Sequence, residues 1–381
     1  MRRLTVCVVS ISALVGAFYL GLWTADRRVS DRIEMLKSEL RAPTYIADPS
    51  VWRMIRAPLT ATDAYLDRHS QWREGFAAPA MWQPERRAEL ERGFQSLGTF
   101  FEQVDSLLDD VTCRSVLDHG EIVSELDPMP GLSRHRTNVL CARALTEFEE
   151  PDGSRLAARR LGQALDLIRL GDNGREIAYT TSTAEEDIVL SALRQLLADD
   201  RADGAAFQRE LDDRLERVSR EDRVEAVLKS SVELYLESER WRSEASWARP
   251  WTRYEAWRER RRVSEGLAMS IELARTDNLK SRALFMKGDA MDRPACVNGW
   301  MIIADSFHLH ELHLDLARRA LALAADRETR GAPTVDRYTG GFFQERPTER
   351  GIALCAASAM AAQDIGNSDS RARLLTWTIP R

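Results

Sequence analysis

An apolar run at the N-terminus constrains this chain more than any other feature of its sequence. The residues from Leu4 to Trp23 include no charged side chain, and Arg2 and Arg3 precede them. At about 1.5 Å per residue, a helix of about twenty residues covers roughly 30 Å, the thickness of the hydrocarbon core of a bilayer. Tyr19 and Trp23 lie near its far end, where amphipathic rings favour the interface. The run therefore predicts one transmembrane helix.

Two fates of this helix fit the sequence. An uncleaved signal anchor fits its length and is the favoured interpretation, whereas a cleaved signal peptide would use the small residues at 15–17. The positive-inside rule favours a cytoplasmic domain, because more basic residues follow the helix than precede it: Arg27, Arg28, Arg32 and Lys37. The two-arginine start is typical of exported chains. We predict a single-pass inner-membrane protein whose main domain lies outside the cytoplasm.

The rest of the chain is predicted to be helical. Apolar residues recur at three and four positions between 84 and 117, which indicates one long amphipathic helix. Further helices are predicted at 133–148, 154–170, 182–198, 221–248, 253–275 and 300–327, and from 204 onward. In the helix from 182, Glu185 and Glu186 are placed in the first turn, where acids suit the helix dipole. The fold class is thus all-α, a multi-helix array or bundle.

Proline and glycine positions suggest the domain boundaries. The predicted organisation is an anchor at 1–25, a juxtamembrane connector with short helices at 26–83, a helical domain at 84–330, and a small non-helical cap at 331–381. Five glycines interrupt the cap, and three segments in it are predicted strands, at 342–344, 352–355 and 375–379.

Composition excludes some functions and leaves others open. A net charge of -6 argues against a protein that coats nucleic acid. The expected partners are the membrane, through the N-terminal helix, and a protein of the cell envelope. The chain has no GxSxG, P-loop or GxGxxG motif, so neither a cofactor nor a reaction is predicted.

Four cysteines lie outside the apolar run. They permit two disulfides, for which Cys113–Cys141 and Cys296–Cys355 are the predicted pairs, and four buried thiols are the alternative. No two of the five cysteines form a CxxC pair, so zinc binding by cysteine is not predicted.

A histidine-rich segment is the candidate metal site. The segment from Asp305 to Asp315 contains His308, His310 and His313, together with Glu311. On a helix, His310 and His313 are one turn apart and could share a metal ion, completed by Asp305, His308 or Glu311. The motif of zinc proteases needs two histidines four residues apart, and this sequence has them three apart. The alternative is a solvated polar helix face.

Tryptophan and arginine interleave in residues 241–262. The spacing places four rings on one helical face, those of Trp247, Trp251, Tyr254 and Trp257, and Arg253 and Arg258 lie among them. This composition is typical of interface hot spots and of helices at a membrane surface. Plain packing, with arginine stems over indole rings, is the alternative.

The C-terminal tail carries a resemblance to known proteins. Asp336-Arg337-Tyr338-Thr339-Gly340-Gly341-Phe342-Phe343 is followed by Arg350 to Leu354, Asp364 to Gly366, and Leu375 to Pro380. This tail resembles one found in uncharacterised membrane-anchored helical proteins of planctomycete-like bacteria, and it is distantly similar to the tail of type II secretion pseudopilins. Two features depart from the pseudopilin pattern: no glycine-phenylalanine processing site precedes the apolar run, and residues 357–362 replace the acidic, glycine-rich turn.

Three functional hypotheses follow from the sequence. The favoured one is a non-catalytic, membrane-tethered helical protein that binds a partner in the bacterial cell envelope. The enzyme alternative is a metal-dependent hydrolase that uses the segment from His308 to His313. The resemblance adds a third, a pseudopilin-like secretion component.

Overall fold

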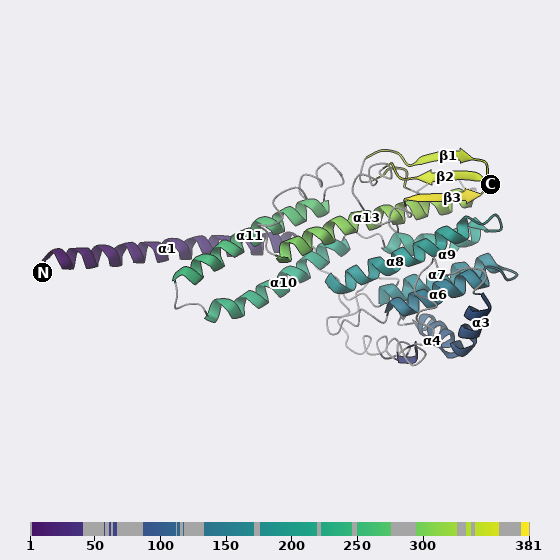
Figure 1. Ribbon diagram of the computed structural model, residues 1–381, viewed down its shortest axis with the longest axis horizontal. Helices are drawn as coiled ribbons and strands as arrows, with labels where there is room; N and C mark the ends of the chain where they lie inside the picture. Colours follow the sequence, from purple (N-terminus) through teal and green to yellow (C-terminus); the bar gives the residue numbers. More distant parts are fainter. Residues whose placement is uncertain are drawn as a thin grey trace. The chain divides into compact units, whose positions relative to one another are not determined.

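The chain is described by a computed structural model (Figure 1). It describes residues 2–40, 57, 61, 64–66, 87–111, 113–114, 117, 133–170, 176–218, 222–245, 250–275, 295–325, 333–336, 340–357 and 375–380, although some side chains inside these elements, including those of 2–13, are not described. Helices dominate, and a small sheet lies at the C-terminus, which confirms the predicted all-α character and the non-helical cap.

The chain divides into two compact units. Unit 1 contains residues 1–42, 224–276 and 280–305, and unit 2 contains residues 43–223, 277–279 and 306–381. The division falls within one helix, α13 (Ala295–Ala324), whose first part belongs to unit 1 and whose second part belongs to unit 2.

Unit 1 is built from α1 (Arg2–Glu39), α10 (Asp222–Ala245), α11 (Pro250–Arg275) and the start of α13. Its core takes one apolar stripe from each helix, such as Ile33 and Leu36 of α1, Leu228 of α10, Leu267 of α11 and Trp300 of α13. Charged contacts border this core: Arg260 donates to both carboxylate oxygens of Asp26 at 3.0 Å, and Arg275 donates to the carbonyl of Glu39 at 3.2 Å.

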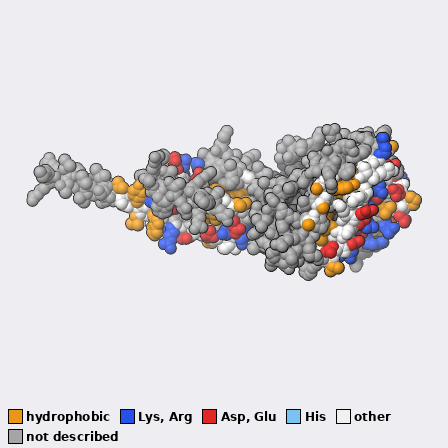
Figure 2. Space-filling view, turned by 90° about the horizontal axis from the view of Figure 1, so that it is seen from below, with side chains coloured by type: hydrophobic (Ala, Val, Ile, Leu, Met, Phe, Trp, Pro, Cys, Tyr) orange, Lys and Arg blue, Asp and Glu red, His pale blue; other side chains and the backbone are white. Residues whose placement is uncertain are grey.

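The two ends of α1 differ in how much of their surface is covered. Ile33, Leu36 and Leu40, at its C-terminal end, are buried. Leu14 and Leu20 are 71% and 65% exposed, and Figure 2 shows hydrophobic side chains gathered on this part of the helix. Within the residues that the structure describes, no helix has both the length and the apolar character needed to cross a membrane.

Unit 2 is mainly a stack of helices: α3 (Arg87–Ser96), α4 (Gly98–Asp109), α6 (Ser133–Glu147), α7 (Gly153–Leu170), α8 (Glu176–Leu197), α9 (Gly204–Val218) and the end of α13. The helix predicted at 84–117 is thus two helices, interrupted at Leu97. The apolar stripe survives the interruption, since Leu90, Phe94, Leu97 and Val104 are buried. Val111, at the far end of the predicted stripe, is 81% exposed.

A three-stranded antiparallel sheet completes unit 2. Its strands are β1 (Gln344–Thr348), β2 (Gly351–Cys355) and β3 (Thr376–Pro380), in the order β1-β2-β3. Leu354 and Trp377 are buried partners across β2 and β3. Polar contacts join the sheet to the helices, because Arg319 of α13 donates to Glu345 and Arg194 of α8 donates to the carbonyl of Thr376.

Three of the cysteines are free thiols. Cys113 and Cys141 are both buried and form no bond with each other, so the predicted Cys113–Cys141 disulfide is absent from the structure. Cys355 is also a free thiol, whereas the side chain of Cys296 lies outside the described residues. Burial, followed by the nearby charge of Asp110, raises the pKa of Cys113 from 9.0 to about 11.

These thiols are expected to differ in reactivity. At pH 8, iodoacetamide should modify half-buried Cys355 but modify Cys113 about 100-fold more slowly than an ordinary thiol, because the raised pKa leaves about a hundredth of the usual thiolate. Peptide mass spectrometry of the folded protein measures the rates, and the guanidinium-unfolded chain is the control. Labelling of Cys113 only after reduction would contradict the free thiol and restore the predicted disulfide.

Candidate metal centre

Three side chains from two helices of unit 2 converge on one point. The Nδ1 atoms of His310 and His313 lie 3.2 Å and 3.1 Å from the same carboxylate oxygen, Oδ1 of Asp187. One ligand atom from each residue lies within 4.8 Å of the others, which makes the trio able to hold a metal ion.

The helices explain this convergence. His310 and His313 are one turn apart on α13, so both rings project from the same face. Asp187 lies in the interior of α8. Both imidazoles are buried, at 4% and 1% exposure, and the side chain of Asp187 remains 19% exposed. The trio is thus closed on the histidine side and reaches solvent only through the carboxylate.

Glu186 supports the trio from behind. Its Oε2 lies 2.5 Å from Nε2 of His310, and the contact is an ion pair when the ring is protonated. Glu186 is 1% exposed. His310 therefore lies between two carboxylates, with Nδ1 facing Asp187 and Nε2 facing Glu186.

Electrostatics favours positive charge at this point. Burial works against a charged imidazole, but the charge of Glu186 and the contacts with both acids outweigh it and raise the pKa of His310 to about 10. Burial likewise works against ionisation of Asp187, but hydrogen bonds from His310 and His313 hold its pKa well below the usual range. The two acids therefore favour a positive charge between them, whether on the His310 ring or on a bound cation.

A further carboxylate connects the centre to α6. Thr137 donates to Oε2 of Glu185 at 3.1 Å, and both side chains are buried. Burial and the charge of Glu185 raise the pKa of the Cys141 thiol, one turn further along α6. The three helices α6, α8 and α13 therefore meet around a polar interior, in a unit that is otherwise packed with apolar side chains.

The distances fit a tetrahedral transition-metal site. Zinc binds imidazole nitrogen and carboxylate oxygen at about 2.0–2.2 Å, which puts neighbouring ligand atoms of a tetrahedron about 3.3 Å apart. The two separations between Asp187 and the histidines are close to this value. Nε2 of His310, held against Glu186, matches the carboxylate–histidine–metal arrangement in which an outer carboxylate fixes the tautomer of a ligating ring.

The sequence located two of these residues and missed two. His310 and His313 come together as predicted, whereas His308 and Glu311 contribute no atom to the trio, although both are buried. The side chain of Asp305 is not described. The alternative of a solvated polar face is wrong for His308, His310, Glu311 and His313, because each is at most 4% exposed.

Asp187 and Glu186 were missed because the start of α8 was misplaced. With a helix beginning at Ser182 or Thr183, the acids belong to its exposed first turn, but α8 begins at Glu176 and puts them in its interior. Three adjacent acids followed by Ile188-Val189-Leu190 were the available signal, since carboxylates in a buried helix interior need partners.

The Trp/Arg segment lies in unit 1. Trp247 lies outside the described residues, and the side chain of Trp251 is not described. Tyr254 and Trp257 are half-buried with ring centroids 5.7 Å apart, Arg253 is half-buried, and Arg258 is exposed. The four described side chains thus form neither a fully exposed face nor a closed core.

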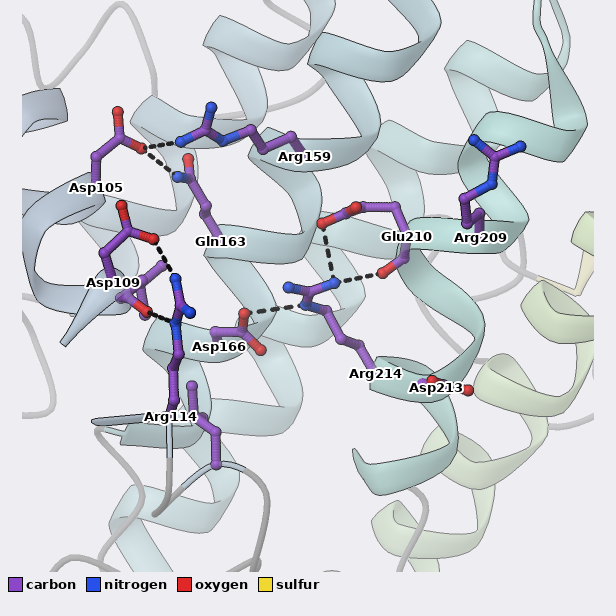
Figure 3. Close-up of a pocket in the computed structure, with 12 residues that line it drawn as sticks. Asp105, Asp109, Arg114, Arg159, Gln163, Asp166, Arg209, Glu210, Asp213 and Arg214 are labelled. Carbon is purple, nitrogen blue, oxygen red and sulfur yellow. Dashed lines mark hydrogen bonds and ion pairs between the residues drawn. The ribbon is translucent and has the colours of Figure 1, made fainter. Parts of the chain in front are cut away.

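A pocket of about 350 Å³ lies between α4, α7 and α9 (Figure 3). Its charged lining is largely paired within itself: Arg159 with Asp105, Arg114 with Asp109, and Arg214 with Asp166 and Glu210. Because these charged groups already neutralise one another, they offer little charge to a ligand. The histidine–carboxylate centre is therefore the stronger candidate for function.

Comparison with known proteins gives no relative on which a function could rest. No family model, curated protein or solved structure matches the chain. The case for function therefore depends on the geometry of the site.

Proposed function

We propose that the protein is a membrane-tethered helical protein that binds one divalent transition-metal ion. His310, His313 and Asp187 are its ligands, and Glu186 positions His310. The observation that carries this proposal is the convergence of two buried imidazoles on one carboxylate oxygen, at separations that match the edges of a zinc tetrahedron.

The ligand set favours a particular class of metal. Two imidazole nitrogens and one carboxylate oxygen suit zinc and its neighbours, whereas magnesium and calcium prefer oxygen ligands throughout. Zinc is the ion that we expect the chain to hold most tightly under ordinary conditions, because affinity rises along the first transition row and free copper is scarce in cells.

Burial favours binding over hydrolysis. Three protein ligands leave a fourth position open, as in catalytic zinc sites, and this keeps a metal-dependent hydrolase as the second candidate. However, both imidazoles are at most 4% exposed, and only Asp187 reaches solvent. A water molecule fits such a position better than a substrate does, so a structural or sensing role for the ion is favoured.

The tether belongs to the same proposal. From Leu4 to Trp23 the sequence is free of charge, and the described side chains of this run, such as Leu14, Phe18 and Leu20, are mostly exposed along the helix. Exposed apolar side chains on a helix that otherwise packs well are stabilised by lipid. We place the helical units in the cell envelope outside the cytoplasm, and sedimentation with alkaline-washed membranes tests the tether.

Zinc titration of the full chain tests the metal site. After removal of metals, competition against a chromogenic chelator should show one zinc ion per chain, which excess magnesium does not displace. Glu186→Gln should weaken binding about 10- to 100-fold, because the outer carboxylate no longer fixes the His310 ring. Glu259→Gln changes an exposed acid of α11 and is the control. A stoichiometry below one half, or equal losses in the two variants, would overturn the proposal.

A further inference from the structure

Helices α1 and α11 of unit 1 run in parallel, and their register changes by only two residues along the pair. Arg260 binds Asp26 across a sequence separation of 234, and Arg275 binds Glu39 across a separation of 236. The Arg253 guanidinium lies over the ring of Tyr19, 5.5 Å from its centroid, in the same register. This register places the first turns of α11 beside the last turns of the apolar run.

The same register reveals a repeated sequence. Trp23-Thr24-Ala25-Asp26-Arg27-Arg28-Val29-Ser30-Asp31 in α1 corresponds to Trp257-Arg258-Glu259-Arg260-Arg261-Arg262-Val263-Ser264-Glu265 in α11. Both copies read tryptophan, three residues, two arginines, valine, serine and an acid. Each copy also stacks an arginine on its own tryptophan, Arg27 on Trp23 at 5.8 Å and Arg261 on Trp257 at 6.0 Å. Two tryptophan–arginine pairs therefore lie level with each other.

The order of residues along the pair matches the layers of a bilayer surface. Exposed apolar side chains come first, then Tyr19 and Trp23 with Tyr254 and Trp257, and then Arg27 and Arg28 with Arg258 and Arg261. Arg253 lies in the aromatic layer, over the ring of Tyr19. Arg27 and Arg28 lie four and five residues beyond Trp23, which is about 6–8 Å along a helix. The polar headgroup layer on one side of a bilayer is also about 5–8 Å deep.

We propose that a collar binds the headgroups of anionic phospholipids, with the first turns of α11 at the membrane surface beside the anchor. The collar consists of Trp23, Arg27 and Arg28 of α1 and Trp257, Arg258 and Arg261 of α11. The inference rests on the tether of the proposed function and extends it to a second helix and a class of lipid. Aromatic rings favour the interface, and guanidinium groups carry the charge and the paired donors that suit phosphate. Arg27, Arg28, Arg258 and Arg261 are exposed, and Arg261 also pairs with the exposed Glu265 at 2.9 Å, so all four guanidinium groups are open to solvent on the side that would face the headgroups.

Quenching of tryptophan fluorescence by brominated lipids tests the collar. The full chain is reconstituted in liposomes, and quenching by brominated phosphatidylglycerol is compared with quenching by brominated phosphatidylcholine across mole fractions. The two curves give the relative association constant, which is the affinity of the collar for phosphatidylglycerol divided by its affinity for phosphatidylcholine. We expect phosphatidylglycerol to be preferred at least fivefold, about the factor that one arginine near an anionic surface contributes, and 0.5 M salt should reduce the preference.

A triple variant identifies the residues responsible. Arg258→Gln, Arg261→Gln and Arg262→Gln together should lower the constant by about twofold or more and leave a smaller preference from Arg27 and Arg28. The matched variant Arg155→Gln, Arg159→Gln and Arg209→Gln in unit 2 should keep the wild-type value. Circular dichroism checks that each variant retains its helices. An unchanged preference in the α11 variant, or a wild-type constant close to one, would refute the collar.

The tether can fail separately from the collar. Chain that remains with the liposomes after alkaline washing supports the tether whatever the lipid preference is, so a constant close to one then refutes the collar alone. Chain that is lost on washing refutes the tether, and the collar with it.

Discussion

Replacing Asp187 by asparagine is expected to weaken zinc binding by more than 100-fold. The change keeps the shape of the side chain but removes the anionic oxygen that both imidazoles contact. Removing a direct metal ligand should lower the affinity for zinc by more than the 10- to 100-fold that follows removal of a residue, such as Glu186, that only contacts a ligand. Chelator competition measures the affinity, and Asp213→Asn, an exposed acid on α9, is the matched control.

The same variant should lose the stabilisation that zinc confers. An ion that binds only the folded chain adds about 2.7 kcal/mol to the free energy of unfolding when its concentration is one hundred times the Kd. Thermal unfolding of the wild type should therefore shift upward with zinc, and unfolding of Asp187→Asn should not. An equal zinc shift in both proteins would place the bound ion elsewhere and contradict the assignment of Asp187.

Replacing Gly204 by alanine is expected to destabilise unit 2 by about 2–4 kcal/mol, at or above the upper end of the cost of overpacking. Gly204 is the first residue of α9, and an added Cβ would lie 2.2 Å from both the carbonyl carbon and the carbonyl oxygen of Ala324, at the end of α13. The clash cannot be relieved by a change of rotamer, because the atoms that the Cβ would meet belong to the backbone. One of the two helix ends must therefore move.

A second glycine provides the control for this change. Gly98 is the first residue of α4, and an added Cβ there would meet nothing within 4 Å. Gly98→Ala should be neutral or stabilising by up to about 1 kcal/mol, because alanine loses less backbone entropy in a helix. Denaturant unfolding compares the two variants, and similar stabilities would contradict the close approach of α9 and α13.

Most helices were predictable because apolar periodicity reports local geometry. The predicted helices at 133–148, 154–170 and 221–248 are close to α6, α7 and α10. The interruption at Leu97 was not predictable, because the apolar stripe continues through it and only backbone hydrogen bonds mark the change.

In the candidate metal site, too, contacts within one helix were predictable and contacts between distant segments were not. His310 and His313 are neighbours on one helix, so their spacing predicted that they meet. Asp187 is more than one hundred residues away in the sequence, and no local pattern connects it to them. Likewise, the repeat shared by α1 and α11 is too short to be noticed until the packed helices supply its register.

The pairing of α1 with α11 also sets an order of events during synthesis. The partner of α1 lies 234 residues later in the chain, which is roughly 10–50 s of translation at 5–20 residues per second. During this interval the first helix has left the ribosome without its partner, and its apolar half needs lipid or a chaperone to prevent aggregation. A nascent chain stalled before residue 250 should therefore depend on the insertion machinery more strongly than the finished protein does.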